Sequence, residues 1–232
     1  MRVRPVRLNT TVASLFVVGS ACFVLGSVPW YAEAAGAEAD SATYFVGSVF
    51  FTSASFGQLL QAQTRAMTEV DEVSQHVPAQ VLFWSWLPQD RGWLAAATQF
   101  PGTLFFNLST AAALVHNLTV EQQDKHVWRP DFFGSTLFLV SSAYAIVALG
   151  QGFLAFHPSS TPWRIAWLNM VGSLFFMASA LASYVLPTTG QLIDSWWAIT
   201  GTLLGAICFL VGAALMLPAW SRAVRAPGRA PT

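Results

Sequence analysis

Long apolar stretches dominate the chain, and charged residues fall between them. A charged side chain costs roughly 2.5 to 3.5 kcal/mol at the centre of a bilayer, so a membrane-spanning helix must lie between charges. A helix needs ~20 residues to cross ~30 Å of hydrocarbon. The charge-free intervals that are long enough cover residues 8–32, 41–64, 92–120, 132–163, 165–193 and 195–221.

These intervals predict helices, because continuous apolar runs lack the polar alternation of barrel strands. We expect the helices over residues 10–30, 42–62, 94–116, 133–156, 164–186 and 196–218. The predicted fold is therefore all-α, a polytopic integral membrane bundle of six transmembrane helices that forms a single domain over residues 1–232. We expect residues 63–92 to be a cytoplasmic or interfacial connection and residues 219–232 to be a basic cytoplasmic tail.

Composition agrees with a bilayer as the solvent. Hydrophobic side chains make up 54% of the chain and charged ones only 9%, against about 25% charged residues in an ordinary soluble domain. This composition excludes a soluble globular protein and a disordered chain. The formal net charge is zero, so no basic field is present that could bind nucleic acid.

The basic residues predict the orientation. The N-terminal segment, the second-to-third connection, the fourth-to-fifth connection and the tail hold most of them. The other side holds Lys125 and Arg129. Basic residues favour the cytoplasmic side, so we expect a multi-pass protein of the bacterial cytoplasmic (inner) membrane with both termini in the cytoplasm. As the alternative, the first span and the small residues 32–37 form a signal peptide that is cleaved.

A short sequence motif recurs once in each predicted span, with the template G-[STA]-x-x-F-x-x-[GAS]-[STA]. At ~100° per residue the constrained positions cover about 120° of a helix, so they form one face. Small residues let helices approach closely in a bilayer, which predicts a packing face. In the alternative, these residues line a pore. The motif glycines and phenylalanines are Gly19, Phe23, Gly47, Phe51, Gly102, Phe106, Gly134, Phe138, Gly172, Phe176, Gly205 and Phe209.

The paired spans with Gly-Ser-x-x-Phe resemble the YrhK-like bacterial membrane domain, a short unit of two apolar helices. The chain looks like three such hairpins in tandem, although the long connection over residues 63–92 departs from a compact series. The resemblance implies a bacterial membrane protein. It carries over no catalytic residue, because that family has no established activity.

A few polar residues lie within the predicted spans, and Gln99, Asn107 and Asn169 are the candidates for an intramembrane polar pocket between the third and fifth helices. Gln151 lies within the fourth interval. The alternative interpretation is that these side chains form hydrogen bonds between helices.

Candidate chemistry is otherwise sparse. Residues 116–126 contain His116, Glu121, Asp124 and His126, which are types that can ligate a metal, but no H-E-x-x-H spacing is present. The two cysteines, Cys22 and Cys208, do not form a CxxC pair and are expected to be packing residues. We therefore expect no metal, no cofactor and no catalytic residue.

These patterns favour a non-enzymatic structural or interaction protein of the membrane. The alternative is a transporter or channel for a small neutral solute, and a third reading is a membrane-embedded enzyme. The expected partners are the lipid bilayer and either a second copy of the chain or another membrane protein. The sequence identifies no small-molecule ligand.

Overall fold

The computed structural model describes residues 2–3, 5–68, 79–80, 83, 85–115, 117–150, 152–153 and 155–225. The described residues are all-α apart from two very short strands, which confirms the all-α part of the predicted fold. The long helices are α1 (Pro5–Gly26), α3 (Ala37–Thr68), α4 (Arg91–Ala112), α6 (Arg129–Ala148), α7 (Thr161–Ala182) and α8 (Ser195–Arg225).

Short elements connect the long helices. The short helix α2 (Pro29–Ala35) links α1 to α3, while α5 (Val120–Gln123) and the π-helical turn η1 (Asp124–Trp128) lead directly into α6. Strand β1 (Arg2–Val3) pairs antiparallel with β2 (Ala79–Gln80).

Local sequence explains several helix ends. Asp90 caps α4 by accepting a 2.7 Å hydrogen bond from the Trp93 backbone N–H, and Ser160 caps α7 through the Trp163 N–H. Such caps satisfy donors that have no partner within the helix. At the other end, α6 stops at Ala148, before the expected residue 156. The reason is Gly150, whose φ of 69° leaves the helical region.

The ends of α3 and α8 also differ from the expected ranges. Helix α3 continues to Thr68, so the expected connection begins as helix. Within that connection, residues 69–78 lie outside the described residues. Helix α8 continues to Arg225, and residues 226–232 of the expected tail lie outside the described part of the chain.

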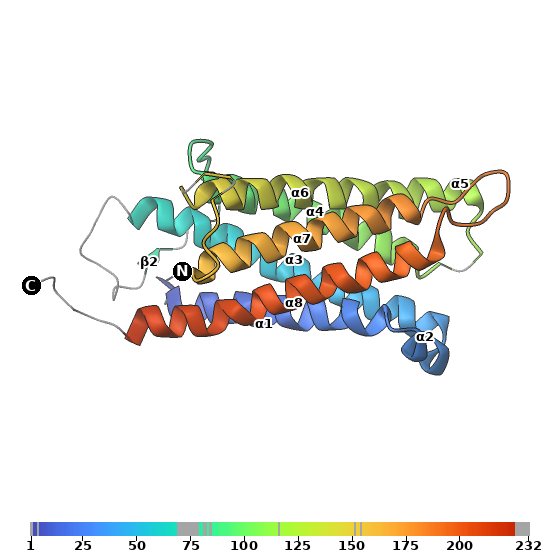
Figure 1. Ribbon diagram of the computed structural model, residues 1–232, viewed down its shortest axis with the longest axis horizontal. Coiled ribbons are helices and arrows are strands. Elements are labelled where there is room, and N and C mark those ends of the chain that lie inside the picture. The colour runs from blue at the N-terminus through green and yellow to red at the C-terminus, as the bar shows by residue number, and fades with distance from the viewer. Residues whose placement is uncertain are drawn as a thin grey trace, which may run out of the picture.

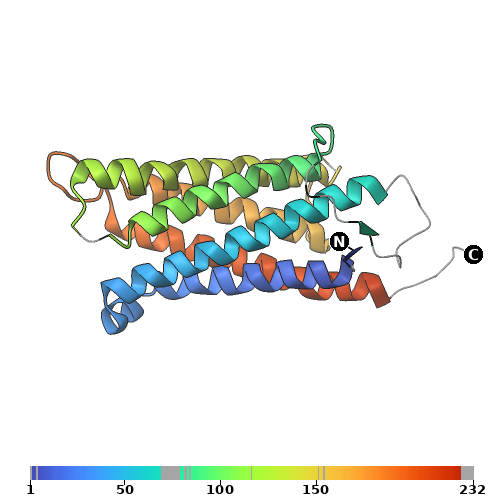
Figure 2. The same cartoon turned by 180° about the vertical axis from the view of Figure 1, so that it is seen from behind.

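The long helices form a closed ring in which each one packs against its neighbours in sequence. Contact between α1 and α8 closes the ring. Figures 1 and 2 show the elongated bundle, with the start of α1 and the end of α8 at one end and α2 and α5 at the other. We call the latter end the α5 end. The ring thus consists of three helical hairpins, α1/α3, α4/α6 and α7/α8.

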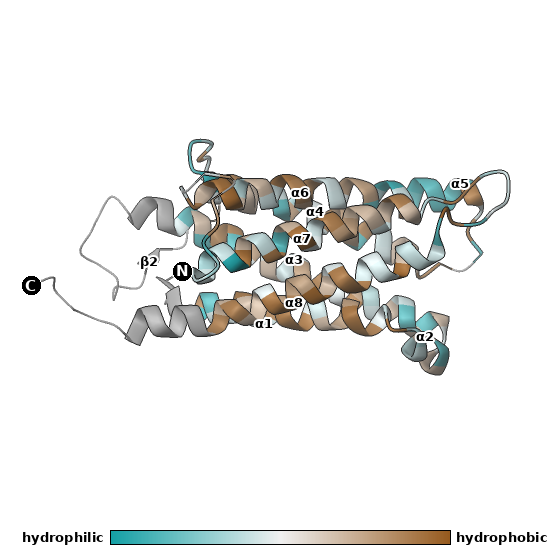
Figure 3. Cartoon of the chain, viewed as in Figure 1, coloured by the Kyte–Doolittle hydropathy of each residue, from teal (hydrophilic) through white to brown (hydrophobic). Residues whose placement is uncertain are grey.

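Helical segments long and apolar enough to cross a membrane are found four times in the described residues. They cover Arg7–Gly26, Val120–Ala148, Thr161–Ala182 and Ser195–Leu217. Figure 3 shows apolar residues along the middle of the bundle and hydrophilic ones concentrated toward its ends. By length and composition, these four segments could cross a membrane, as expected for a multi-pass membrane protein.

Candidate functional site

The motif glycines face one another within each hairpin. A methyl group on Gly19 would lie 2.7 Å from the Phe51 ring and 3.0 Å from the carbonyl oxygen of Gly47. The same relation holds for Gly172, where a methyl group would lie 3.0 Å from the Phe209 ring and 3.1 Å from the Gly205 carbonyl oxygen. In the middle hairpin, a methyl group on Gly134 would lie 3.1 Å from the carbonyl oxygen of Gly102. In all three hairpins, glycine permits a backbone approach that a side chain would block.

The motif phenylalanines meet in the centre of the ring as two layers. Phe51, Phe138 and Phe209 form one layer, with ring centroids 5.6 to 6.4 Å apart. These are the motif residues of α3, α6 and α8, the second helices of the three hairpins. The spacing is typical of favourable aromatic pairs.

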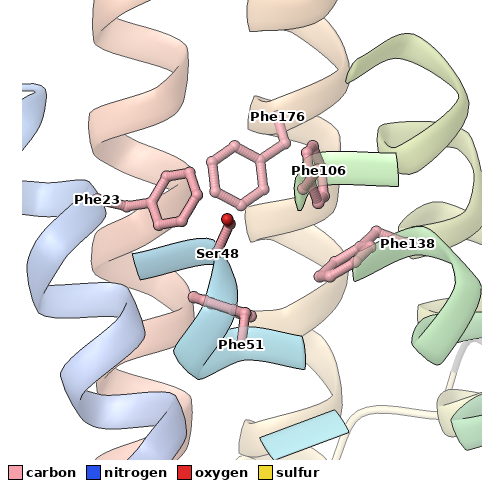
Figure 4. Close-up of a pocket in the computed structure, with 6 residues that line it drawn as sticks. All are labelled: Phe23, Ser48, Phe51, Phe106, Phe138 and Phe176. Atoms are coloured by element: carbon pink, nitrogen blue, oxygen red, sulfur yellow. The ribbon is translucent and has the colours of Figure 1, made fainter. Parts of the chain in front are cut away.

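The second layer comes from the first helices of the hairpins. Phe176 contacts Phe23 at 6.0 Å and Phe106 at 5.8 Å between ring centroids. Figure 4 shows these rings converging around Ser48. Each hairpin also pairs its own two rings, with centroid distances of 5.7 Å in α1/α3, 5.1 Å in α4/α6 and 5.3 Å in α7/α8.

These rings fill the centre of the bundle. The cavity lined by Ser48 and five of the motif phenylalanines holds about 10 Å³. That space is about the minimum for one water molecule, and a water would need two to four polar partners. Among the described residues Ser48 is its one polar lining residue, and the Ser48 hydroxyl is already hydrogen-bonded to the Phe45 carbonyl oxygen and to Thr110. At this level the described residues enclose an apolar core rather than a solvent path.

Motif hydroxyls connect adjacent hairpins. Ser48 Oγ lies 2.9 Å from Thr110 Oγ1 across the α3/α4 interface, and Ser142 Oγ lies 2.9 Å from Ser173 Oγ across α6/α7. Both bonds join the second motif residue of one helix to the last motif residue of its neighbour. At α8/α1 the residue equivalent to Ser142 is Ala213, and the buried hydroxyl of Ser20 has no hydrogen-bond partner.

The predicted intramembrane polar residues lie at different interfaces. Gln99 on α4 accepts a 3.4 Å hydrogen bond from Ser141 on α6. Asn169 on α7 lies beside Gly212 on α8, where an added methyl group would be 3.2 Å from its Oδ1. The Oδ1 of Asn107 is buried without a hydrogen-bond partner, and Gln151 lies outside the described residues.

The histidine-containing segment lies at the α5 end. His116 is outside the described residues. Asp124 accepts two hydrogen bonds from Arg129, at 3.0 and 2.7 Å. Among the described residues, no group of three or more histidine, cysteine or acidic side chains is placed to hold a metal ion. Cys22 and Cys208 are free cysteines, each packed against a motif glycine of the partner helix.

A larger cavity of about 260 Å³ opens at the α5 end. The end of α4, the π-helical turn, the start of α6 and the connection from α7 to α8 form its walls. Its polar lining residues are Gln123, Trp128, Asp131 and Ser183. The sequence pattern did not predict this cavity, although Asp131 is a carboxylate that directly precedes the fourth predicted span.

The connection from α7 to α8 is ordered by its own hydrogen bonds. The backbone N–H of Leu186 donates to Gln191 at 2.8 Å, and the N–H of Ile193 donates to Tyr184 at 2.9 Å. Val185 and Leu192 pair as an antiparallel bridge and both line the cavity. The loop therefore forms a fixed wall.

No family model, curated protein or solved structure matches the chain. The resemblance to the YrhK-like domain thus stays a prediction.

Proposed function

We propose that the protein is a six-span integral membrane protein of the bacterial cytoplasmic membrane with a structural or interaction role and no catalytic activity. Both termini face the cytoplasm. The phenylalanine-filled centre of the ring carries this proposal, because a path for a solute through the bundle needs space along its axis. The packing role of the repeated glycine and phenylalanine face is part of the same proposal.

The ring arrangement supports six spans. Helices α3 and α4 contain more polar residues than the four apolar candidates, but they lie between α1 and α6 in the ring. If the other four helices of the ring cross the bilayer, α3 and α4 must cross it as well, because they run alongside them in the same bundle. Their polar side chains are tolerable where they face neighbouring helices, as Gln99 does toward Ser141.

The outer surface supports lipid as the principal partner. Large apolar side chains are exposed on the long helices, and Leu108 and Leu174 are 58% and 54% exposed. Such exposure is ordinary for a surface solvated by lipid tails, but it would promote aggregation in water. The same surface is available to a second copy of the chain or to another membrane protein.

Charged residues at the two ends support the orientation. Arg91 and Arg164 lie at the starts of α4 and α7, at the same end of the bundle as the start of α1 and the end of α8. Glu33, Glu38 and Asp40 lie on α2 and α3 at the opposite end. Basic residues prefer the cytoplasmic side.

The test combines topology with transport. The background chain has Cys22 and Cys208 replaced by serine, and each variant carries one new cysteine at position 91, 124 or 190. An impermeant maleimide should label the cysteine at position 91 only from the cytoplasmic side. It should label the cysteines at positions 124 and 190 only from the outside. Proteoliposomes should then show glycerol and urea flux equal to that of protein-free vesicles. Glycerol or urea flux above that of protein-free vesicles, measured with the purified and correctly oriented protein, would overturn the proposal that the protein is not a transporter.

A further inference from the structure

The cavity at the α5 end is lined by a carboxylate that has no partner among the described residues. Asp131 is partly buried and lines this space. Within the described residues, no hydrogen bond or ion pair engages its side chain. A charge withdrawn from water is costly unless a counter-charge or hydrogen bonds compensate it.

The nearest arginine in sequence does not supply that counter-charge. Arg129 donates two hydrogen bonds to Asp124, and its Nη2 lies 2.7 Å from the Asp124 carboxylate. Two carboxylates therefore lie close in sequence on η1 and α6, one paired and one unpaired. The unpaired one is the one that lines the cavity.

Other polar groups in the cavity add acceptors. The Ser183 hydroxyl donates to the Ala180 carbonyl oxygen at 3.0 Å, which leaves its oxygen lone pairs available. Gln123 also lines the cavity, and its side-chain amide has a carbonyl oxygen that can accept a hydrogen bond. An ammonium group has three donors and no acceptor, so a wall with a carboxylate, a hydroxyl and an amide oxygen suits it.

The remaining wall is apolar and fixed in place. The Trp128 indole donates to the Ala180 carbonyl oxygen at 2.8 Å and contacts Phe132 and Tyr184, with ring centroids 5.3 and 4.8 Å away. Trp128 belongs to the π-helical turn, a feature found frequently at functional sites. Leu118 and Val185 extend the apolar surface.

We propose that this cavity binds a primary ammonium group that carries a short apolar attachment. The ammonium pairs with the Asp131 carboxylate, and the attachment packs against Trp128 and the neighbouring aliphatic side chains. A volume of about 260 Å³ lies just below the usual range of ~300 to 1,000 Å³ for ligand pockets, which fits a small ligand. The proposal goes beyond the structural role and does not depend on it.

Two sources could supply this chemistry at the end of a membrane bundle. One is a free alkylamine from the aqueous phase. The other is the ethanolamine headgroup of a phospholipid, whose ammonium lies at the level of the helix ends. Both present the same cation to Asp131, so the experiment must separate them by competition.

The test uses the full chain in nanodiscs of phosphatidylcholine, with n-butylammonium as the probe and calorimetry as the readout. We expect saturable binding, with 1-butanol and Na⁺ failing to reproduce it. Asp131→Asn should weaken binding about tenfold or more, the loss expected for one charge-assisted hydrogen bond. Leu118→Trp, which fills the cavity and keeps the carboxylate, should weaken it similarly.

Matched controls and lipid composition complete the design. Glu121→Gln removes one exposed negative charge from the same end of the bundle and should leave binding unchanged. Nanodiscs that contain phosphatidylethanolamine distinguish the two sources. If this lipid weakens the apparent affinity for n-butylammonium, the headgroup occupies the cavity. If the affinity for n-butylammonium is unchanged, the natural ligand is a free amine. Absence of saturable binding in phosphatidylcholine, or equal binding by Asp131→Asn and the parent chain, overturns the proposal.

Discussion

Ser142 Oγ lies 2.9 Å from Ser173 Oγ, and this hydrogen bond joins the second hairpin to the third. The equivalent bond between the first and second hairpins joins Ser48 to Thr110 at the same distance. The interface that closes the ring has Ala213 at the equivalent position, and the hydroxyl of Ser20 has no partner. Two of the three interfaces thus pair a second with a last motif residue through their hydroxyls, and at the third the last motif residue, Ala213, has no hydroxyl.

Ala213→Ser should therefore stabilise the protein. The new hydroxyl would face Ser20 in the way that Ser142 faces Ser173. Hydrogen bonds between membrane helices contribute about 0.6 kcal/mol on average, so we expect a gain of that size in the free energy of unfolding. Titration of the purified protein with a denaturing detergent measures it. Ala214→Ser, at the adjacent exposed position, should give no gain, and an equal gain there would contradict the pairing.

Gly172→Leu should disrupt the third hairpin. Even one methyl group at this position would lie 3.0 Å from the Phe209 ring and 3.1 Å from the Gly205 carbonyl oxygen. Overpacking of this kind costs roughly 1 to 3 kcal/mol, and a backbone neighbour cannot move aside easily. Thermal unfolding in detergent should show a lower midpoint, while Val171→Leu at the neighbouring exposed position should leave it unchanged. A stable Gly172→Leu protein with altered solute flux would instead favour the pore interpretation.

Phe138→Ala should open the centre of the ring. The Phe138 side chain is 2% exposed and contacts Phe51, Phe106 and Phe209. Removal of a buried phenylalanine ring typically costs about 3 to 5 kcal/mol. Unfolding should show a loss of that order, and added benzene should restore part of it by filling the new space. Phe133→Ala, at a position that is 52% exposed, should cost far less; similar losses for both variants would argue against a packed centre.

Trp128→Phe should loosen the contact between the π-helical turn η1 and α7. The substitution keeps an aromatic ring but removes the 2.8 Å hydrogen bond to the Ala180 carbonyl oxygen. We expect a loss of about 1 kcal/mol in the free energy of unfolding. Trp196→Phe, whose parent side chain is 63% exposed, is the control. An unchanged stability in the Trp128 variant would mean that the indole bond contributes nothing.

The mature N-terminus is open to a direct measurement. Helix α1 packs against both α3 and α8, so its removal would leave the ring without the helix that closes it. We expect intact-mass analysis of membrane-extracted protein to retain the residues of α1. A mature chain that begins near residue 38 would mean that the first span is a signal peptide and would reduce the bundle to five long helices.

The sequence alone predicted the all-α class. Charged residues are excluded from the interior of a bilayer, so they separate apolar stretches that are long enough to cross it as helices. It also placed Gly172, Ser173 and Phe176 on one face, since their spacing follows the helical repeat. Helix ends were less predictable. Helix α6 stops before Gly150, which has a positive φ. A hydrophobicity pattern contains no information about that backbone conformation.

Tertiary structure decided what the repeated face encloses. A face of small residues and phenylalanine fits a packed seam and a pore lining equally well in sequence, and only the convergence of Phe51, Phe138 and Phe209 at centroid distances of 5.6 to 6.4 Å distinguishes them. The cavity at the α5 end depended even more on the fold. It joins Asp131 to Ser183, residues from separate elements that no periodicity relates, because a cavity is set by distances between elements and not by the order of residues within them.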